Sequence, residues 1–595
     1  MSHPRFLILS CFWLLAAWSA QAAEFFVAPQ GNDRHPGTAK KPFATLERAQ
    51  QAVRALPADL DEEIIVTLRQ GTYFLDRTLE FDARDSGRKG NPVVWRSCPG
   101  EKAMISGGVA VAGWQPIGEG RFSAAAPLDD FRRLTVHNQP AVRARTPNKD
   151  SYYRLKLWDL RRREVVVENG DIGDWQNLRD IEFIVQLHWA QSILKIDSLQ
   201  RDRRYAYLTL QDPARDLLFR RDYPPKDENE PYHLENAIEF LDEPGEWYLD
   251  RRQKQLIYLP RPGETLDDHS VLAPRLETLI RVQGTADKPV VDLEFRDLVF
   301  SHTTWLRPSQ QGLLNVQAGQ YTVEPTINNT QFAERPPAAV EVNFAHRTCW
   351  TGNGFFDLAA TGLDLHKGTQ NTRVQGNLFA EIGGNGICVG VFTEPGLQLH
   401  TPYLPEDERE ICVADSLLDN RIVRVAQDYP GCCGIACGAP RQITIAHNKV
   451  SDLPYTGISV GWAWTQKPSA MRGNRIYRNH IHHVLQLLCD GGGIYTLSLQ
   501  PDSWIGENHI HHIQRSPWAV GSLNNGLFLD EGSSGFTVER NVFHHIEQGA
   551  IRHNRTGTIT VIQNHVQDAA LIEQAGPRAL FQRRLAELNR LLKVE

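Results

Sequence analysis

The chain has 595 residues, of which 41% are apolar and 23% charged, and its formal net charge is −7 at neutral pH. This is the composition of a folded, soluble protein with an ample core. A sequence pI of about 6.3 and the lack of a basic cluster argue against nucleic acid as a partner. The mild acidity also argues against a strongly acidic polymer, because no cationic field would attract it.

The N-terminus resembles a secretory signal peptide. Arg5 is followed by an apolar stretch over 6–18 and by the small-x-small cleavage pattern Ala20-Gln21-Ala22. A membrane anchor is the alternative, but the stretch is too short to span a bilayer comfortably. We therefore expect a signal peptide over 1–22, a mature start near Ala23, a periplasmic or extracellular location and no membrane association.

Three parts follow in chain order. Residues 23–108 read as an N-terminal cap and first coils, with strands at 25–27, 64–68 and 93–95 and a helix over 43–55. Residues 109–272 are charge-dense, with strands at 181–187, 205–210 and 255–259, and are predicted to form an inserted β-rich domain.

The remaining sequence is predicted to form the main solenoid over 273–570 and a helical cap over 571–595. An amphipathic helix over 574–593 would cover the open end of the solenoid, where strand edges are otherwise unpaired.

A Gly followed by Ile or Leu and two small or β-forming residues recurs along the main solenoid. The shortest spacing between successive copies is 23 residues, and a degenerate copy begins at Ala550. This is the period of a solenoid coil. The six Gly residues are Gly362, Gly386, Gly434, Gly457, Gly493 and Gly526.

A second marker is an Asn shortly before an apolar strand residue. Short strands separated by turns fit neither a helix period nor a long hairpin. The fold class predicted is all-β, a right-handed parallel β-helix whose coils stack about 4.8 Å apart. The marker residues are Asn377, Asn448, Asn479, Asn508, Asn541 and Asn564.

Residues that serve the solenoid repeat from coil to coil, whereas residues that serve chemistry break the pattern. Asp490 is the one carboxylate three positions before the repeated Gly, and Asp530 is the one carboxylate four positions after it, on the next coil. Two such acids on adjacent coils are what hydrolysis of a glycosidic bond requires. We predict Asp490 and Asp530 as the catalytic pair, with Glu531 as the reserve acid.

Each Asp also has a purely structural explanation, because Asp beside Gly often caps a turn. The two acids are seven positions apart along the coil, so the chain is expected to bend at 491–493 to bring them together. We assign Asp530 as the acid because the neighbouring Glu531 disfavours a second charge. The roles are interchangeable at this stage.

Aromatic side chains are candidates for stacking on the apolar faces of sugars. The predicted substrate-binding residues are Trp305, Tyr495, Trp462 and Trp464, with Trp305 favoured among the tryptophans. Packing beneath a loop is the alternative for each Trp.

His-His pairs recur at the same place in successive coils, at 482–483, 511–512 and 544–545. This favours a stacked ladder over a metal site, and we expect no metal and no cofactor. Among the cysteines, which an exported protein can oxidise, Cys412 with Cys432 or Cys433 is the pair to test for a disulfide.

Four longer motifs stand out in the chain. They are Phe25-Phe26-Val27-Ala28-Pro29-Gln30-Gly31-Asn32-Asp33, Gly383-Gly384-Asn385-Gly386-Ile387, Cys489-Asp490-Gly491-Gly492-Gly493-Ile494-Tyr495 and Asn525-Gly526-Leu527-Phe528-Leu529-Asp530-Glu531-Gly532. The first resembles the start of pectin-lyase-like β-helix proteins in general, and the last two are more specific. Together they resemble glycoside hydrolase family 141 within that superfamily, and the resemblance covers nearly the whole mature chain.

The resemblance implies a hydrolase acting on fucoside- or xyloside-type linkages of complex plant-type or bacterial polysaccharide. It also implies a catalytic aspartate pair at Asp490 and Asp530. An insertion over 394–415 departs from the family pattern, so the substrate does not transfer. A polysaccharide lyase or epimerase and a non-catalytic glycan-binding protein are the alternatives, and we expect a monomer.

Overall fold

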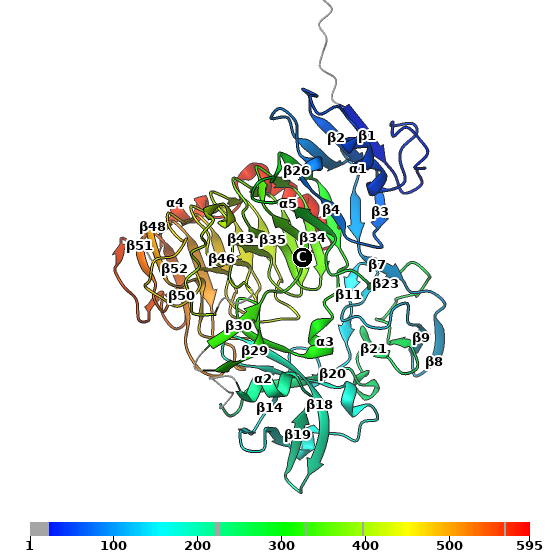
Figure 1. Cartoon of the computed structure of the whole chain (residues 1–595). Coiled ribbons are helices and arrows are strands. Elements are labelled where there is room, and N and C mark those ends of the chain that lie inside the picture. The colour runs from blue at the N-terminus through cyan, green and yellow to red at the C-terminus, as the bar shows by residue number, and fades with distance from the viewer. Residues whose placement is uncertain (1–22, 221–226, 328–329, 395–397, 565–566, 595) are drawn as a thin grey trace, which may run out of the picture.

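The computed structural model describes residues 23–220, 227–327, 330–394, 398–564 and 567–594. The expected signal peptide, 1–22, lies outside the described residues. The described chain winds into a solenoid whose coils run from the N-terminal strands to the C-terminal ones, with a second β-rich body on one side (Figure 1). The predicted parallel β-helix is confirmed.

The strands that carry the repeated Gly form one parallel sheet, here the Gly-led sheet. Its order is β4 (Leu79–Phe81), β24 (Ile280–Gln283), β31 (Ala338–Asn343), β35 (Thr361–Lys367), β38 (Ile387–Val389), β41 (Ile435–Cys437), β44 (Ile458–Val460), β47 (Gly491–Thr496), β50 (Asn524–Leu529) and β53 (Ile551–His553).

The strands that follow the repeated Asn form the Asn-led sheet. Its order is β3 (Gly71–Phe74), β6 (Ala103–Ser106), β27 (Leu298–Ser301), β34 (Gly354–Leu358), β37 (Leu378–Ile382), β40 (Arg421–Val423), β43 (Lys449–Ser451), β46 (His480–His482), β49 (His509–Ile513) and β52 (Val542–Ile546).

A third strand in each coil, just before the Asn, was missed in the main solenoid, and only its members in the first coils, at 25–27, 64–68 and 93–95, were predicted. The third sheet runs β1 (Ala23–Val27), β2 (Ile64–Leu68), β5 (Val93–Ser97), β26 (Leu293–Arg296), β33 (Cys349–Thr351), β36 (Arg373–Gln375), β39 (Ser416–Leu418), β42 (Thr444–Ala446), β45 (Arg475–Tyr477), β48 (Leu499–Gly506), β51 (Ser534–Glu539) and β54 (Ile559–Ile562). A two-stranded pair, β25 (Val290–Val291) and β32 (Ala345–His346), joins coils at a corner.

Buried Asn side chains hold the turns between the third sheet and the Asn-led sheet. In each coil the Asn amide donates to the side-chain oxygen of the Asn in the next coil and to a backbone carbonyl; Asn479 Nδ2, for example, donates to Asn508 Oδ1 at 3.0 Å and to the Ile445 carbonyl at 2.9 Å. The ladder therefore satisfies polar groups that the corner would otherwise bury unpaired. Asn353 and Asn420 also belong to it, although the sequence analysis did not single them out.

The N-terminal coils stack directly on coils that lie much later in the sequence. Strands β5, β6 and β4 pair in parallel with β26, β27 and β24. The insertion therefore interrupts the chain without interrupting the solenoid. Helix α1 (Leu46–Arg54), capped by the Thr45 side chain, packs its apolar face on the first coil.

The insertion contains three sheets. One is β11 (Gln139–Pro140), β10 (Thr135–Val136), β23 (Val271–Pro274) and β7 (Gly108–Ala110), and a second is β12 (Val142–Arg143), β21 (Glu246–Asp250), β22 (Gln255–Tyr258), β9 (Arg121–Ala125) and β8 (Gln115–Gly118). The largest is β13 (Arg145–Thr146), β20 (Pro231–Glu235), β17 (Glu182–Gln186), β18 (Gln191–Arg201), β19 (Tyr205–Leu210), β16 (Glu164–Glu168) and β15 (Leu157–Asp159), with β14 (Tyr153–Arg154) beside β20 and α2 (Ala214–Arg220) after β19.

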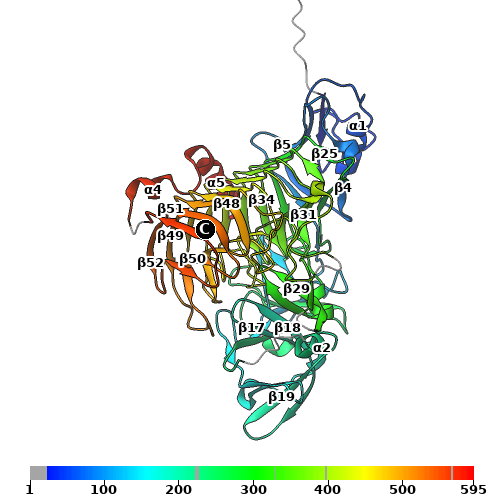
Figure 2. The same ribbon diagram turned by 60° about the vertical axis from the view of Figure 1, so that its left-hand side comes forward.

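A second excursion from the solenoid extends this largest sheet. After α3 (Arg307–Gln311), β28 (Leu313–Gln317) pairs with β18 and continues into β29 (Gln320–Ile327) and β30 (Thr330–Glu334). The sequence analysis placed these residues in the main solenoid, because it recognised the insertion only by the absence of the repeat. Figures 1 and 2 show this arm beside the insertion, below the coils.

The C-terminal helices lie elsewhere than expected. Helix α4 (Ala569–Gln574) precedes α5 (Ala579–Leu592), and α5 places Leu585, Leu588 and Leu592 against the outer face of the Asn-led sheet at β27, β34, β37 and β40. These are middle strands of that sheet, so α5 covers its side. The predicted helix is confirmed, but its expected position over the open end is wrong, because the apolar patch that it matches lies on the side.

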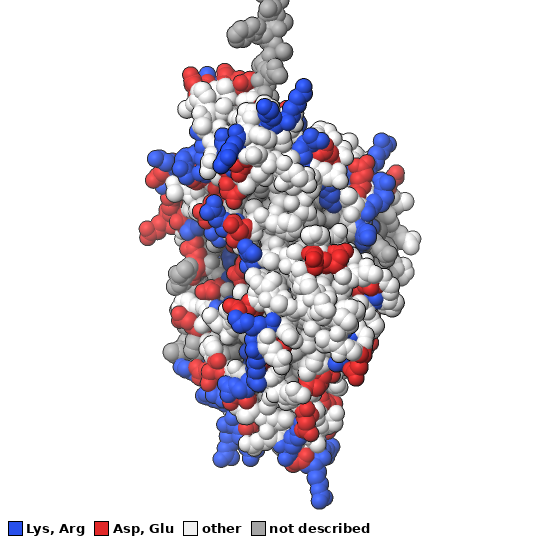
Figure 3. All heavy atoms as spheres, turned by 90° about the vertical axis from the view of Figure 1, so that its right-hand side faces the viewer, with Lys and Arg blue, Asp and Glu red and all other residues white. Residues whose placement is uncertain are grey.

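All eight cysteines of the described residues are free, including Cys412, Cys432 and Cys433, so the disulfide considered above is not formed. No helix among the described residues has the length and apolar character needed to cross a membrane. On the face drawn in Figure 3, basic and acidic side chains are mixed and a broad area is uncharged.

Candidate active site

Asp490 and Asp530 stand at opposite ends of two neighbouring strands in the Gly-led sheet. Asp490 immediately precedes β47, and Asp530 immediately follows β50. Strand β47 runs from Gly491 to Thr496, and within it the chain folds closely at Gly492, where an added Cβ would lie 2.5 Å from the Ile494 carbonyl oxygen. This agrees with the bend expected within 491–493. Asp490, just before it, has a φ of +58°, in the left-handed region.

Asp530 is a buried carboxylate with a hydrogen-bond donor on each oxygen. Its exposed fraction is 8%, Tyr495 Oη donates to Oδ2 at 2.5 Å and Asn554 Nδ2 donates to Oδ1 at 2.7 Å. Burial raises the pKa of Asp530 above its usual value, and the Asp490 charge adds to that rise, while the donated hydrogen bonds oppose it. The two acids are therefore within electrostatic reach of each other.

Asp490 is held as an ion pair. Arg552 Nη1 lies 3.1 Å from Asp490 Oδ1, and the Arg552 guanidinium sits over the Phe528 ring at 4.1 Å. Behind it, the buried Tyr455 hydroxyl donates to the Asp490 carbonyl at 3.2 Å. The pair therefore consists of a buried carboxyl group, Asp530, and one that is paired with an arginine, Asp490.

One row of the Gly-led sheet links the two acids. Tyr495, Phe528 and Arg552 are in register on three successive strands. Tyr495, at one end of this row, donates to Asp530, and Arg552, at the other end, pairs with Asp490. On the preceding coils the same row continues with small side chains, Ser459, Ala436 and Cys388. Beyond these three coils the row again carries charged side chains, because Asp364 is in register with Cys388 and Glu341 with Asp364.

Glu531 points away from this pair. Its carboxylate pairs with Arg555 at 2.9 Å, an arginine whose side chain is 76% exposed. The reason given above for treating Asp530 as the acid, a charged Glu531 beside it, is therefore replaced by the burial of Asp530.

The candidate aromatic residues occupy three different environments. Tyr495 is buried against Phe528 with its hydroxyl on Asp530. Trp464 is half-buried, contacts the cluster of Tyr495 and Phe528, and lies 5.1 Å from the His400 ring. Trp462 is buried behind Trp464. Trp464 is thus the tryptophan beside the acids.

Trp305 lies in another place. It is 2% exposed, packs on Tyr429 at 4.7 Å, and lines a cavity of about 420 Å³ between the arm and the early coils. Asp364 also lines this cavity, and burial raises its pKa to about 7. Since β35 and β47 are four strands apart in the Gly-led sheet, Asp364 is separated from Tyr495 by about 19 Å of stacked coils.

Arg552 and Asn554 were missed because they belong to the degenerate last copy of the repeat. Arg552 stands in the second position after Ala550, so the sequence already showed it as a basic residue that breaks the ladder. The contacts of Arg552 and Asn554 with the two acids were not predictable, because insertions of different lengths between the coils hide which residues stand in register.

The insertion forms one side of the site. The His188 carbonyl accepts a hydrogen bond from the Cys489 amide at 2.7 Å, next to Asp490, and Arg154 donates to the Pro517 carbonyl at 2.8 Å. Trp189, 39% exposed, anchors its indole nitrogen on the Val316 carbonyl at 2.8 Å. An exposed aromatic side chain is therefore held at this wall.

In the described chain, the side-chain clusters that could hold a metal ion are made of histidines on the Asn-led sheet, separate from the two acids on the Gly-led sheet. The chemistry available at Asp490 and Asp530 is that of a carboxylate pair with one buried and one ion-paired member.

The fold and the site define the class, a parallel β-helix protein with an inserted β-rich domain beside a carboxylate pair, and comparisons with known proteins name the family. Residues 122–261 match the family model described as GH141 insertion domain, and residues 417–579 match the right handed beta helix region. A solved structure named glycoside hydrolase is 33% identical, with a TM-score of 0.91, over 94% of this chain and 100% of that one.

The chain belongs to the family 141-like glycoside hydrolases of the right-handed parallel β-helix superfamily. It is also 37% identical over 82 residues to the uncharacterized protein YwoF of Bacillus subtilis (strain 168), a match that spans 14% of this chain and 15% of that protein. XylC in complex with xylose is 11% identical with a TM-score of 0.43, over 92% of this chain and 86% of that one. At that level the likeness bears on neither mechanism nor substrate.

Proposed function

We propose that this protein hydrolyses glycosidic bonds in complex plant-type or bacterial polysaccharide, at fucoside- or xyloside-type linkages. Asp530 protonates the leaving oxygen, and Asp490, paired with Arg552, activates water or attacks the sugar. The observation that carries the proposal is the unequal pair, since a buried acid with a raised pKa beside an ion-paired carboxylate divides the two roles.

The substrate enters as a terminal unit rather than as the middle of a polymer. The insertion and the loop over 514–523 enclose the Asp490 end through the contacts of His188 and Arg154. Trp189 offers an exposed indole at this wall, and Trp464 offers one near Asp530. Aromatic faces of this kind stack on sugar rings. Both are substrate-binding residues in this proposal.

Arg552 favours a second candidate function, a polysaccharide lyase or epimerase, because a basic residue can remove the proton next to a uronate carboxylate. Its ion pair with Asp490 and its position over Phe528 speak against a free base. Release of reducing ends and absorbance of unsaturated product, measured on a panel of polysaccharides, separate the two. Reducing ends without new absorbance support hydrolysis, and absorbance from uronate polymers would overturn it.

We also propose that the protein acts in the periplasm or outside the cell, on the strength of the leader over 1–22. N-terminal sequencing of the protein recovered from the periplasm or medium should begin near Ala23. Retention in the cytoplasm with Met1 intact would contradict export.

A further inference from the structure

Eight histidines form a regular array on the outer face of the Asn-led sheet. His480 is in register with His509, and His482 with His511, which is in register with His544. The rings stack, with centroids 4.8 Å apart and planes 9° apart for His480 and His509, and 4.8 Å and 6° for His511 and His544. The remaining members are His483, just after β46, His512 in β49 and His545 in β52. The stacked ladder predicted from the sequence is confirmed.

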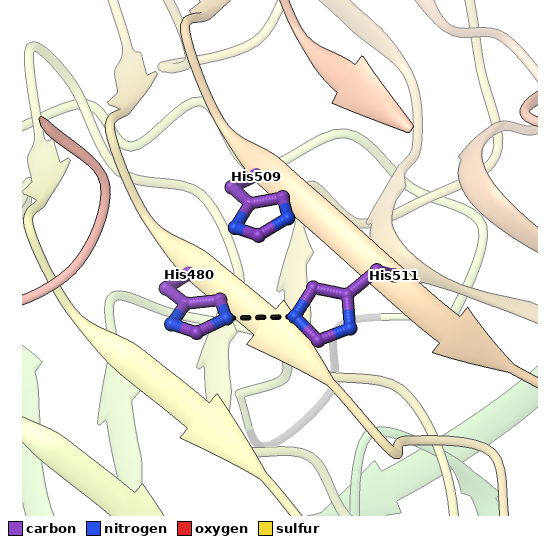
Figure 4. Close-up of side chains that lie close together, drawn as sticks. All are labelled: His480, His509 and His511. Atoms are coloured by element: carbon purple, nitrogen blue, oxygen red, sulfur yellow. Dashed lines mark hydrogen bonds between the residues drawn. The ribbon is translucent and has the colours of Figure 1, made fainter. Parts of the chain in front are cut away.

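Stacking alone does not explain how the ring nitrogens are placed. His480 Nε2 lies 2.8 Å from His511 Nε2, and one ring nitrogen from each of His480, His509 and His511 lies within 4.8 Å of the other two (Figure 4). A second set, His511, His512 and His544, shares His511 and meets the same limit. The nitrogens of three coils therefore converge on His511.

We propose that this array binds a divalent transition-metal ion such as Zn²⁺, with His480, His509 and His511 as its ligands. The donor set is entirely imidazole, which suits Zn²⁺, Ni²⁺ or Cu²⁺ and not Mg²⁺ or Ca²⁺. Three protein nitrogens leave a fourth position for water in a tetrahedral site.

The geometry requires only side-chain adjustment. Two bonds of about 2.0–2.1 Å at a tetrahedral angle set ligand nitrogens about 3.4 Å apart. The contact of 2.8 Å between His480 and His511 must open slightly, and longer separations within the 4.8 Å limit must close. His480 and His511 are both half-buried, so their rings have room to adjust. The backbone positions are already fixed by the parallel strands β46, β49 and β52.

Burial and the neighbouring histidines together lower the pKa of His480 to about 3, of His509 to about 4 and of His511 to about 2. Two charged side chains also bear on the rings, Lys449 on His480 and His482, and Asp452 on His482.

Zinc titration by calorimetry, using the whole metal-free protein and Zn²⁺ alone as the probe, tests the proposal. The wild type should bind one ion, and anomalous diffraction at the zinc edge should place it among His480, His509 and His511. His511→Gln should weaken binding by at least about tenfold, since both sets lose their shared ligand. His480→Gln should also weaken it, because it removes a ligand of the proposed set.

The matched control lies within the same array. His545 stacks on His512 but belongs to neither set, so His545→Gln should bind zinc like the wild type. The apo forms of the variants should unfold at the same temperature as the wild type, which separates lost ligation from lost folding. Equal binding by His511→Gln and the wild type, or no zinc bound by the folded wild type, would overturn the proposal.

Discussion

At the residue scale, the environment of each acid explains its role. Asp530 is enclosed by Tyr495 and Asn554, so its ionisation depends on two donors and on burial. The Asp490 carboxylate is held in place by its ion pair with Arg552. The acids were predictable because each interrupts a repeat that would otherwise carry a neutral residue. Their partners were not, because a side-chain contact between coils depends on register that a single sequence with long insertions does not reveal.

Tyr495→Phe removes a donor that stabilises the charged form of Asp530. Because this hydrogen bond lowers the pKa, its loss raises the pKa further, and the acid stays protonated to a higher pH. The alkaline limb of the kcat/KM profile should therefore move to higher pH, with a lower maximum if Tyr495 also orients the carboxyl group. A profile whose alkaline limb stays in place or moves to lower pH would contradict the assignment of Asp530 as the acid.

At the element scale, two repeats in the sequence predicted two of the three strands in each coil. The third strand carries its own signal, an apolar residue three positions before the Asn, as in Ile445, Ile476 and Ile505. Nothing in the sequence indicated where α5 packs on the solenoid. Its apolar stripe predicted burial, but only the folded coils show that Phe356 and Leu378 present the matching patch on the side of the solenoid.

The Asn ladder should be the most sensitive part of the corner to substitution. Asn479→Ala removes the acceptor for the Asn448 amide and the donor to the Ile445 carbonyl. Each buried polar group left unpaired costs about 1–3 kcal/mol, so the free energy of unfolding should fall by roughly 3 kcal/mol.

Chemical denaturation measures this loss, and Asn564→Ala is its control. Asn564 is half-buried at the end of the ladder and accepts from Asn541, so its loss should cost clearly less. Equal costs at the two positions would show that the ladder does not act through burial.

At the scale of the whole molecule, the site depends on how the insertion is fastened to the coils. Arg133, from the insertion, is buried between Asp357 and Asp428 of the solenoid, at 3.0 and 2.8 Å. The sequence showed where the repeat stops and resumes, and both boundaries lie close to β7 and β23. It could not show that the arm of β28 to β30 joins the insertion, because that pairing is set by tertiary contact.

Arg133→Met should leave Asp357 buried without its cation. Breaking a buried ion pair from one side costs about 3–5 kcal/mol, and the wall beside Asp490 should loosen, so KM should rise together with the loss of stability. Arg347→Met, which breaks the more exposed pair with Asp292, should cost no more than about 1 kcal/mol. Thermal unfolding and steady-state kinetics of both variants check this, and a stable Arg133→Met with unchanged KM would contradict the proposed fastening.

The measurement that tests the account most directly is glycosidase activity of Asp490→Asn and Asp530→Asn beside Glu531→Gln, on a substrate that the wild type cleaves. All three variants should fold, because each replacement keeps the shape of the side chain. We expect the two Asn variants to lose at least about a thousandfold in kcat and Glu531→Gln to stay within a few fold of the wild type. Activity that survives in either Asn variant, or that is lost in Glu531→Gln alone, would contradict the assignment of Asp490 and Asp530 as the catalytic pair.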